Sequence, residues 1–251
     1  LVYFIFSGTP MVVVPLKMYA GIDVFILLSI PGFIIAGNLM NQGGLTDKII
    51  DFCNHLLGHV RGGLSFVNIS ASMLFAGISG TAISDTASLG AVMIPAMKKE
   101  GYDSDFSCAI TAASSTVGPI IPPSLPMIIA ATLSGLSVGK LFLAGAIPGL
   151  LLGLGLMLVA YFVAKKKNYP KHPKSTPLQI FKSFTNTFWA LLMTVIILFG
   201  IVGGVFTPTE ASVVAVLYAL FIGLFVYKKL NLRNISVVVL DSMKTTASLV
   251  I

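Results

Sequence analysis

Hydrophobic residues gather in runs long enough to cross a membrane, and short polar segments separate these runs. The clearest runs cover residues 24–40, 141–164, 188–206 and 211–227. A helix rises 1.5 Å per residue, so about twenty apolar residues span the roughly 30 Å hydrocarbon core of a bilayer. The pattern predicts an all-α membrane protein, built as a multi-span helical bundle.

Two shorter apolar runs, residues 64–79 and 82–97, lie between Arg61 and Lys98. Each provides only about 24 Å of helix, which is short of a full crossing. Basic residues flank the cytoplasmic ends of spans, so the chain should leave the membrane on the side where it entered. We therefore expect a re-entrant helical hairpin that turns at "SGTAISDT", residues 79–86. Two tilted full spans are the alternative, although the turn would then carry a carboxylate to the far surface without a basic flank.

A further interruption falls inside the apolar stretch 106–133, at "ASSTVGPIIPPS", residues 113–124. Three prolines remove N–H donors there, and Gly118 loosens the backbone further. Carbonyl groups freed in this way are tolerated inside a bilayer only where protein buries them or a polar cavity adjoins them. We expect a broken transmembrane helix whose gap lies near mid-membrane, close to the tip of the hairpin.

Composition and charge agree with this class. The chain is 56% hydrophobic and 10% charged, with a mean hydropathy of +0.95 and a net charge of +7. The basic residues cluster at the ends of apolar runs, above all in residues 165–174, which we place in the cytoplasm. The excess positive charge therefore indicates orientation in a lipid bilayer and argues against a nucleic acid partner. Cys53 and Cys108 form no CxxC pair, which gives no support to a disulfide or metal site.

The domain organisation follows from these segments. Of the sixteen Lys and Arg residues, only Lys17 and Lys140 then fall on the outer side. The chain starts and stops inside apolar runs, so we expect a piece of a longer polypeptide. The expected segments are transmembrane helices (1–44), an interfacial amphipathic helix (45–61), the re-entrant hairpin (62–99), the broken helix with the following span (104–164), a cytoplasmic basic linker (165–187) and further spans (188–251).

Asp85 is the only acidic residue that this organisation places at membrane depth. An intramembrane carboxylate costs about 2.5 kcal/mol or more, which makes Asp85 a functional candidate. The alternative is structural, because Asp85 or Ser84 could cap the outgoing helix of the hairpin. Hydroxyl and free carbonyl oxygens suit Na⁺, and the N-terminus of a half-helix attracts an anion. The hairpin tip and the broken helix could form one cage with side-chain oxygens from Ser79, Thr81, Ser84, Ser114, Ser115, Thr116 and Ser124.

The motif "FTPTEA" has a structural explanation. Thr207 stands at the position of an N-cap, Pro208 at the first helical position and Glu210 two residues later. This spacing is typical of a capping box that starts the next span.

Three further stretches carry a family resemblance: "GISGTAISDTASLGAVMIPAMKKEGYDSDF", "TAASSTVGPIIPPSLPMII" and "GKLFLAGAIPGLL". Together with "FTPTEASVVAVLYAL" they resemble the large membrane (permease) subunit of tripartite ATP-independent periplasmic (TRAP) transporters. The resemblance runs over essentially the whole chain. It departs from the family pattern in that the first repeat is cut at its front and the second, inverted repeat is cut after its start.

The resemblance implies an elevator-type transporter of the bacterial inner membrane, not an enzyme. It would import an organic acid anion, a C4-dicarboxylate or a sialic acid, with Na⁺ as coupling ion and no other cofactor. A periplasmic substrate-binding protein and a small membrane subunit would be its partners. The implied substrate-binding residues are Ser79, Gly80, Thr81, Asp85 and Ser124. The implied Na⁺ ligands are Ser79, Ser84, Asp85, Ser114, Ser115, Thr116 and Gly118.

Two other functions remain open at this point. An anion/Na⁺ symporter that needs no binding protein would share most of these features. An intramembrane hydrolase could use Ser115 with Asp85, but it lacks a base, because His55, His59 and His172 all fall at membrane edges in this topology.

Overall fold

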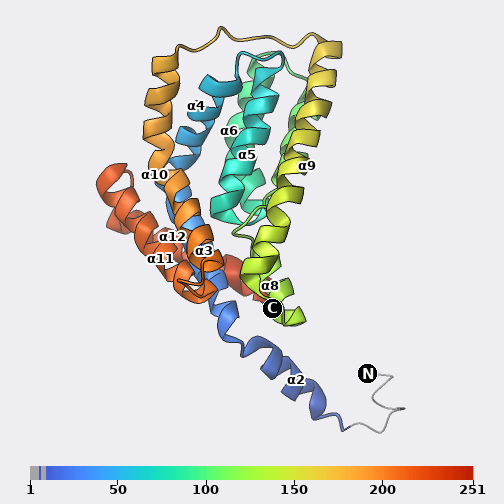
Figure 1. Cartoon of the computed structure of the whole chain (residues 1–251), viewed down its shortest axis with the longest axis vertical. Helices are drawn as coiled ribbons and strands as arrows, with labels where there is room; N and C mark the ends of the chain where they lie inside the picture. The colour runs from blue at the N-terminus through green and yellow to red at the C-terminus, as the bar shows by residue number, and fades with distance from the viewer. Residues whose placement is uncertain (1–5, 7–9, 251) are drawn as a thin grey trace.

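The fold is entirely helical in the computed structural model, which describes residue 6 and residues 10–250 (Figure 1). Within these residues there is no β-strand. The elements are α2 (Val13–Ile22), η1 (Phe25–Leu28), α3 (Ser29–Gln42), α4 (Leu45–Leu57), α5 (Gly63–Ser79), α6 (Ala82–Lys99), α7 (Ser104–Ser115), α8 (Leu125–Ser134), α9 (Val138–Lys167), α10 (Pro177–Val202), α11 (Pro208–Phe221), η2 (Ile222–Val226) and α12 (Leu232–Val250). The first and last expected segments also include residues 1–5, 7–9 and 251, which lie outside the described part.

Four helical segments are long and apolar enough to cross a membrane. They are Phe25–Gln42, Val138–Lys167, Pro177–Val202 and Pro208–Val226. Each contains most of one apolar run of the sequence, so the prediction of a multi-span all-α membrane protein is confirmed. The third segment, α10, starts well before the apolar run 188–206. It ends at Val202, before the end of that run, because Gly203 and Gly204 terminate the helix.

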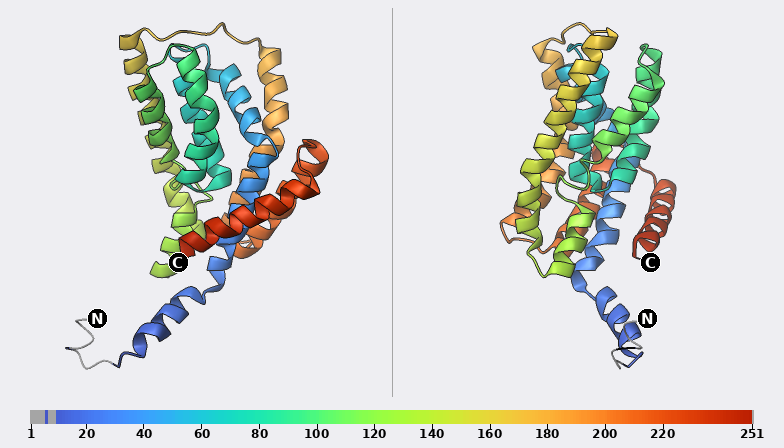
Figure 2. Two further views of the ribbon diagram at one scale, coloured as in Figure 1. Left: turned by 180° about the vertical axis from the view of Figure 1, so that it is seen from behind. Right: turned by 90° about the vertical axis from the view of Figure 1, so that its right-hand side faces the viewer.

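The hairpin forms from α5 and α6, which pack against each other with their turn pointing into the bundle (Figures 1 and 2). The turn is shorter than the expected 79–86. It consists of Gly80 and Thr81, and residues 82–86 already belong to α6. Helix α5 is the centre of the bundle, because α4, α6, α7 and α9 all pack against it and Phe75 is fully buried. Re-entry on one face of the membrane stays a prediction.

The broken helix is present as well. Helix α7 ends at Ser115 and α8 begins at Leu125, so the intervening residues form the gap. Helix α9 packs closely along this gap. A Cβ atom on Gly145 would lie 2.6 Å from the Ile120 carbonyl oxygen, and one on Gly149 would lie 2.6 Å from a side-chain carbon of Ile121. The glycines of α9 therefore make room for the irregular backbone beside them.

The expected basic linker, 165–187, is mostly helical. Helix α9 continues to Lys167, and only residues 168–176 form the non-helical strap across one end of the bundle (Figure 1). Lysine has a good helix propensity, so a run of lysines extends a helix instead of ending it. The Lys167 ammonium lies 2.7 Å from the Asp103 carboxylate and holds the pKa of Asp103 below its usual range.

Helix α4 has the amphipathic character that its sequence predicts. Its apolar side chains Ile49 and Cys53 are buried, and the helix packs against α5 and α10. Helix α4 runs alongside α10 in Figure 1. Its position at the membrane interface stays a prediction.

Helix α3 is packed between α11 and α12. A Cβ on Gly32 would lie 2.7 Å from the Cβ of Ser212, so the α3–α11 contact depends on small residues. The capping box of α11 is confirmed: Thr207 N–H donates to Glu210 Oε2 at 2.8 Å, and Glu210 N–H donates to Thr207 Oγ1 at 3.3 Å. Helix α2 projects away from the bundle (Figures 1 and 2).

Candidate functional site

The tip of the hairpin touches the gap of the broken helix. The Leu125 N–H donates to the Gly80 carbonyl oxygen at 3.3 Å. A Cβ on Gly80 would lie 2.6 Å from the Pro123 carbonyl oxygen, and one on Gly118 would lie 3.3 Å from the Thr81 carbonyl oxygen. Both interruptions seen in the sequence therefore meet in space, and a glycine on each side permits their close approach.

Four helix ends meet at this contact. Helices α5 and α7 end here, and helices α6 and α8 begin here. The Thr81 hydroxyl caps α6 by accepting a hydrogen bond from Ser84 N–H at 3.3 Å. The Ser124 hydroxyl caps α8 by accepting from Met127 N–H at 3.3 Å, and it donates to the Pro119 carbonyl oxygen at 2.5 Å.

The alternative that Asp85 or Ser84 caps α6 is therefore wrong. Thr81 occupies the N-cap, because the helix begins directly after it. The Asp85 side chain lies in the first turn of α6 and is fully buried. Neither of its carboxyl oxygens has a hydrogen-bond partner among the described residues.

A serine hydroxyl lies next to this buried carboxyl group and begins a chain of hydrogen bonds that leads into α7. Ser72 Oγ lies beside it and donates to Ser114 Oγ at 2.9 Å. Ser114 and Ser115 both donate to the Thr111 carbonyl oxygen, at 3.1 and 2.8 Å. Each hydroxyl thus uses its proton on the protein and retains lone pairs that can face a cation.

The residues predicted to supply ligand oxygens fall into two groups in the structure. Ser79, Thr81 and Ser84 line a cavity on one side of the hairpin tip. Asp85, Ser114, Ser115 and Ser124 are buried and do not line it. Gly80 and Gly118 form the contact between the two broken elements, whereas Thr116 is exposed and bonds the Ala113 carbonyl oxygen at 2.7 Å.

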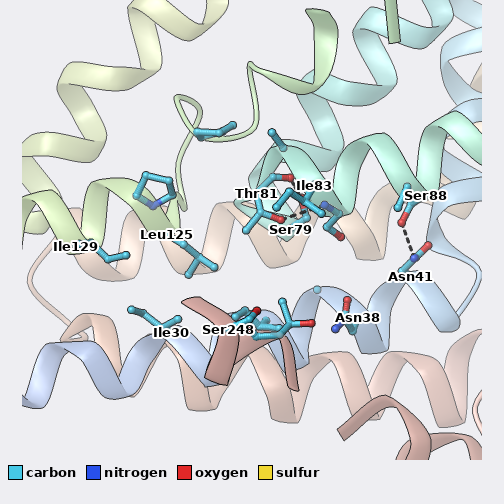
Figure 3. Close-up of a pocket in the computed structure, with 18 residues that line it drawn as sticks. Ile30, Asn38, Asn41, Ser79, Thr81, Ile83, Ser88, Leu125, Ile129 and Ser248 are labelled. Carbon is cyan, nitrogen blue, oxygen red and sulfur yellow. Dashed lines mark hydrogen bonds between the residues drawn. The ribbon is translucent and has the colours of Figure 1, made fainter. Parts of the chain in front are cut away.

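The cavity has a volume of about 640 Å³ and lies between the hairpin tip, α3, α8 and α12 (Figure 3). Two asparagines of α3 line it opposite the hairpin. Asn41 Nδ2 donates to Ser88 Oγ at 2.6 Å, and Asn38 Nδ2 donates to Ser242 Oγ at 2.8 Å. Thr46 Oγ1 donates to Asn41 Oδ1 at 2.6 Å, so both polar ends of Asn41 are held in place. Ile30, Leu125 and Ile129 provide an apolar wall.

Sequence reasoning missed the α3 and α12 walls of this cavity. Asn38, Asn41, Thr245 and Ser248 all line it, and none was a candidate. A signal existed for the first two. They are three residues apart near the end of an apolar run, so they lie on one face of the helix, where amides are costly unless they have a partner.

Close relatives and a family model identify the class of protein. The fold and the site are those of a multi-span membrane protein with a polar centre built from interrupted helices. The family described as "Tripartite ATP-independent periplasmic transporter, DctM component" matches residues 1–251, and the chain belongs to it. It is therefore a multi-pass integral membrane protein of the bacterial inner membrane.

Three relatives illustrate the similarity. The sialic acid TRAP transporter large permease protein SiaM of Vibrio cholerae is 46% identical over 231 residues, which cover 92% of this chain and 54% of that protein. The sialic acid TRAP transporter permease protein SiaT of Haemophilus influenzae is 46% identical over 92% of this chain and 37% of its own length. The C4-dicarboxylate TRAP transporter large permease protein DctM of Pseudomonas aeruginosa is 42% identical over 93% of this chain and 55% of its own length. The chain thus spans about half the length of SiaM and DctM.

Proposed function

We propose that this chain forms one Na⁺ site and one wall of the substrate site in a Na⁺-coupled importer of organic acid anions. The observation that carries the proposal is the Asp85 carboxyl group, fully buried and without a hydrogen-bond partner among the described residues. A buried carboxylate is strongly destabilising unless a cation or hydrogen bonds compensate it. A cation bound beside Asp85 would supply this compensation.

The donor set suits an alkali cation. Among the described residues no three His, Cys, Asp or Glu side chains gather as metal ligands. The hydroxyl next to Asp85 is that of Ser72, which donates to Ser114, and helices α5 and α7 end where the hairpin meets the gap. Hard oxygen donors of this kind, with the negative ends of two helix dipoles, favour Na⁺. Of the residues implied by the family resemblance, Asp85, Ser114 and Ser115 fit best, whereas Ser79, Ser84, Thr116 and Gly118 would require carbonyl oxygens or a local movement.

The adjoining cavity suits an anion. Helices α6 and α8 begin at its edge, and the positive ends of helix dipoles attract carboxylates. Ser79 and Thr81 line the cavity with their hydroxyl groups, and Gly80 and Ser124 lie directly behind them. None of the side chains that line the cavity is charged, so helix N-termini, hydroxyls and the α3 amides would recognise the substrate.

The names of the relatives support the proposed substrate class. SiaM and SiaT are named for sialic acid and DctM for C4-dicarboxylates, and all of these compounds carry carboxylates. The transporter would work with a periplasmic substrate-binding protein and a small membrane subunit, as the family description implies. Which carboxylate this chain selects depends on the cavity walls.

The geometry gives no support to a hydrolase. Ser115 Oγ donates to the Thr111 carbonyl oxygen, so no base receives its proton. His55 bonds Ser175 Oγ at 2.9 Å and His172 bonds Glu100 Oε2 at 2.8 Å, both at the strap end of the bundle. These contacts support the proposal of a transporter component over that of a hydrolase.

Reconstitution tests this function. The full-length protein, its small membrane subunit and its binding protein would be placed in proteoliposomes with labelled N-acetylneuraminate or succinate outside. We expect uptake with an inward Na⁺ gradient and none with choline in place of Na⁺. Uptake that is equal with choline would overturn Na⁺ coupling, and equal uptake without the binding protein would favour a two-component symporter.

A further inference from the structure

A second cavity lies apart from the hairpin, where the start of α4, the first half of α10 and the end of η2 come together. Its volume is about 290 Å³, and none of its lining residues lines the cavity at the hairpin tip. It is lined by Gly43, Gly44, Lys48, Thr185, Asn186, Trp189, Val226, Tyr227 and Lys229. The mixture of two lysines, two aromatic rings and two uncharged polar groups distinguishes it from an apolar packing defect.

Gly44 leaves space for the side chain of Lys229, one of the two lysines of the cavity. Gly44 precedes α4 with a φ of +80°, and a Cβ there would lie 2.6 Å from the Lys229 ammonium nitrogen. Any larger residue at this position would displace the Lys229 side chain, and an L-residue would be strained at this φ. Tyr227 OH donates to the Asn186 carbonyl oxygen at 2.9 Å, which holds the chain before Lys229 against α10.

The charge balance of the cavity is positive. Lys229 Nζ lies 3.2 Å from Asp47 Oδ2, and both side chains are more than half exposed, so this ion pair is weak and open to competition. Lys48 forms no salt bridge within the described residues. Lys228, next in sequence to Lys229, is exposed and adds to the positive potential.

The residues of the cavity are of the kinds that surround a lipid headgroup at a membrane interface. Trp189 and Tyr227 are the aromatic residues expected at a membrane interface, and the basic residues beside them mark the cytoplasmic side. Directly before the cavity residues, Phe221 and Phe225 of the same segment are 55% and 64% exposed, with ring centroids 5.3 Å apart. The two rings form an apolar strip that runs from the polar cavity along the segment Pro208–Val226.

We propose that this cavity binds the phosphate group of an anionic phospholipid from the cytoplasmic leaflet. Lys48 and Lys229 pair with the phosphodiester, and the polar side chains of Thr185 and Asn186 face the headgroup. The acyl chains lie along Phe221 and Phe225. Basic pockets between transmembrane helices on the cytoplasmic side bind lipids of this class, and each nearby lysine adds to the attraction. The lipid would fix the α3–α4 junction to α10 and α11.

Lipid titration tests the proposal. Phosphatidylglycerol would be added to the full-length protein in detergent micelles, and native mass spectrometry would measure bound lipid, with zwitterionic phosphatidylcholine, which has no net charge, as the reference. We expect the K48Q/K229Q variant to bind phosphatidylglycerol roughly tenfold or more weakly. The K98Q/K99Q variant, which removes the same charge from exposed positions at the end of α6, should bind as the parent does. Equal binding by the two double variants would overturn the site.

Two further variants distinguish a loss of the binding site from misfolding of the protein. The K48R/K229R variant keeps both charges and should retain binding. The D47N variant frees Lys229 from its ion pair and should tighten binding; unchanged or weaker binding would contradict the proposed role of Lys229.

Inorganic phosphate separates a lipid site from a free-phosphate site. Phosphate alone, without anionic lipid, should stabilise the protein against thermal unfolding far less than phosphatidylglycerol does. Equal stabilisation by phosphate, lost in K48Q/K229Q, would overturn the lipid assignment.

Discussion

The carbonyl oxygen of Gly80 accepts a hydrogen bond from the Leu125 N–H, 3.3 Å away, and this bond joins the hairpin tip to the start of α8. Gly80 has a left-handed conformation with a φ of +61°, and its α-carbon faces the Pro123 carbonyl oxygen so closely that no side chain fits. The contact between the hairpin and the broken helix therefore depends on Gly80, which has no side chain.

Gly80→Ala should separate the two elements. The new methyl group would lie 2.6 Å from the Pro123 carbonyl oxygen, and alanine adds about 1 kcal/mol of strain at this φ. We expect Na⁺-driven uptake by the full-length transporter to fall roughly tenfold or more, since 1.4 kcal/mol corresponds to a factor of ten. Gly135→Ala is the matched control, because Gly135 has a φ of +67° and nothing within 4 Å. Equal losses in both variants would mean that backbone strain, and not the contact with the gap, explains the effect.

Asn41→Asp tests whether the α3 wall faces the substrate. An aspartate of the same shape can still accept the hydrogen bond from Thr46, and the Ser88 hydroxyl can turn to donate to it. The added negative charge lies in the cavity and should repel an organic acid anion. We expect kcat/KM for uptake to fall roughly tenfold or more. Asn54→Asp introduces the same charge on the exposed side of α4 and should leave uptake unchanged; a similar loss there would contradict the assignment.

The hairpin and the broken helix could be predicted from the sequence, because short apolar runs and prolines mark them locally. The two short apolar runs became α5 and α6 almost residue for residue, and the prolines of the gap ended α7 where they remove backbone donors. The capping box at Thr207 is equally local, because four consecutive residues contain both of its hydrogen bonds. Features of this kind need no knowledge of which helix packs against which.

The divided oxygen set could not be predicted in the same way. Ser84 and Asp85 are neighbours in sequence but point about 100° apart on α6, so one lines the cavity and the other is buried. Which of the two directions leads into the bundle is decided by how α5 and α7 pack against α6. The cavity walls at Asn38 and Thr245 likewise require α3 and α12 to be packed together, which no local pattern of the sequence specifies.

The capping box makes a prediction about stability alone. Thr207→Ala or Glu210→Ala removes one half of the reciprocal pair that starts α11, which should lower the free energy of unfolding by about 1 kcal/mol. Glu210→Gln should stay close to the parent, since α10 uses glutamine at the same position of its own capping box, with Thr176 and Gln179. Thermal unfolding of the purified protein measures all three. A destabilised Glu210→Gln would show that the charge, and not the hydrogen bond, stabilises the helix start.

The two cysteines report on the packing of α4. Cys53 is buried between α4 and its neighbours, and burial raises the pKa of its thiol to about 12, whereas Cys108 on α7 is exposed. A maleimide reacts with the thiolate, so at pH 8 we expect labelling at Cys108 and none at Cys53 in the folded protein. Mass spectrometry after digestion identifies the site. Denaturation in detergent should expose both thiols, and prompt labelling of Cys53 in the native protein would show that α4 is not packed as described.

Asp85→Asn is the most direct test of the ion site, because it keeps the shape of the side chain and removes the charge. The parent should be stabilised by Na⁺ relative to choline, by about 2.7 kcal/mol at a hundred times the dissociation constant. The variant should lose this stabilisation by Na⁺ at the Asp85 site. In choline it should be at least as stable as the parent, because an amide costs less to bury than a bare carboxylate. Asp241→Asn is the control, since Asp241 is exposed and, within the described part of the chain, forms its one salt bridge with Lys244 at 3.3 Å. Thermal unfolding of the full-length protein in both salts supplies the measurement. A variant at Asp85 that responds to Na⁺ as strongly as the parent does would remove the carboxylate from the ion site, and the buried charge would then need another explanation.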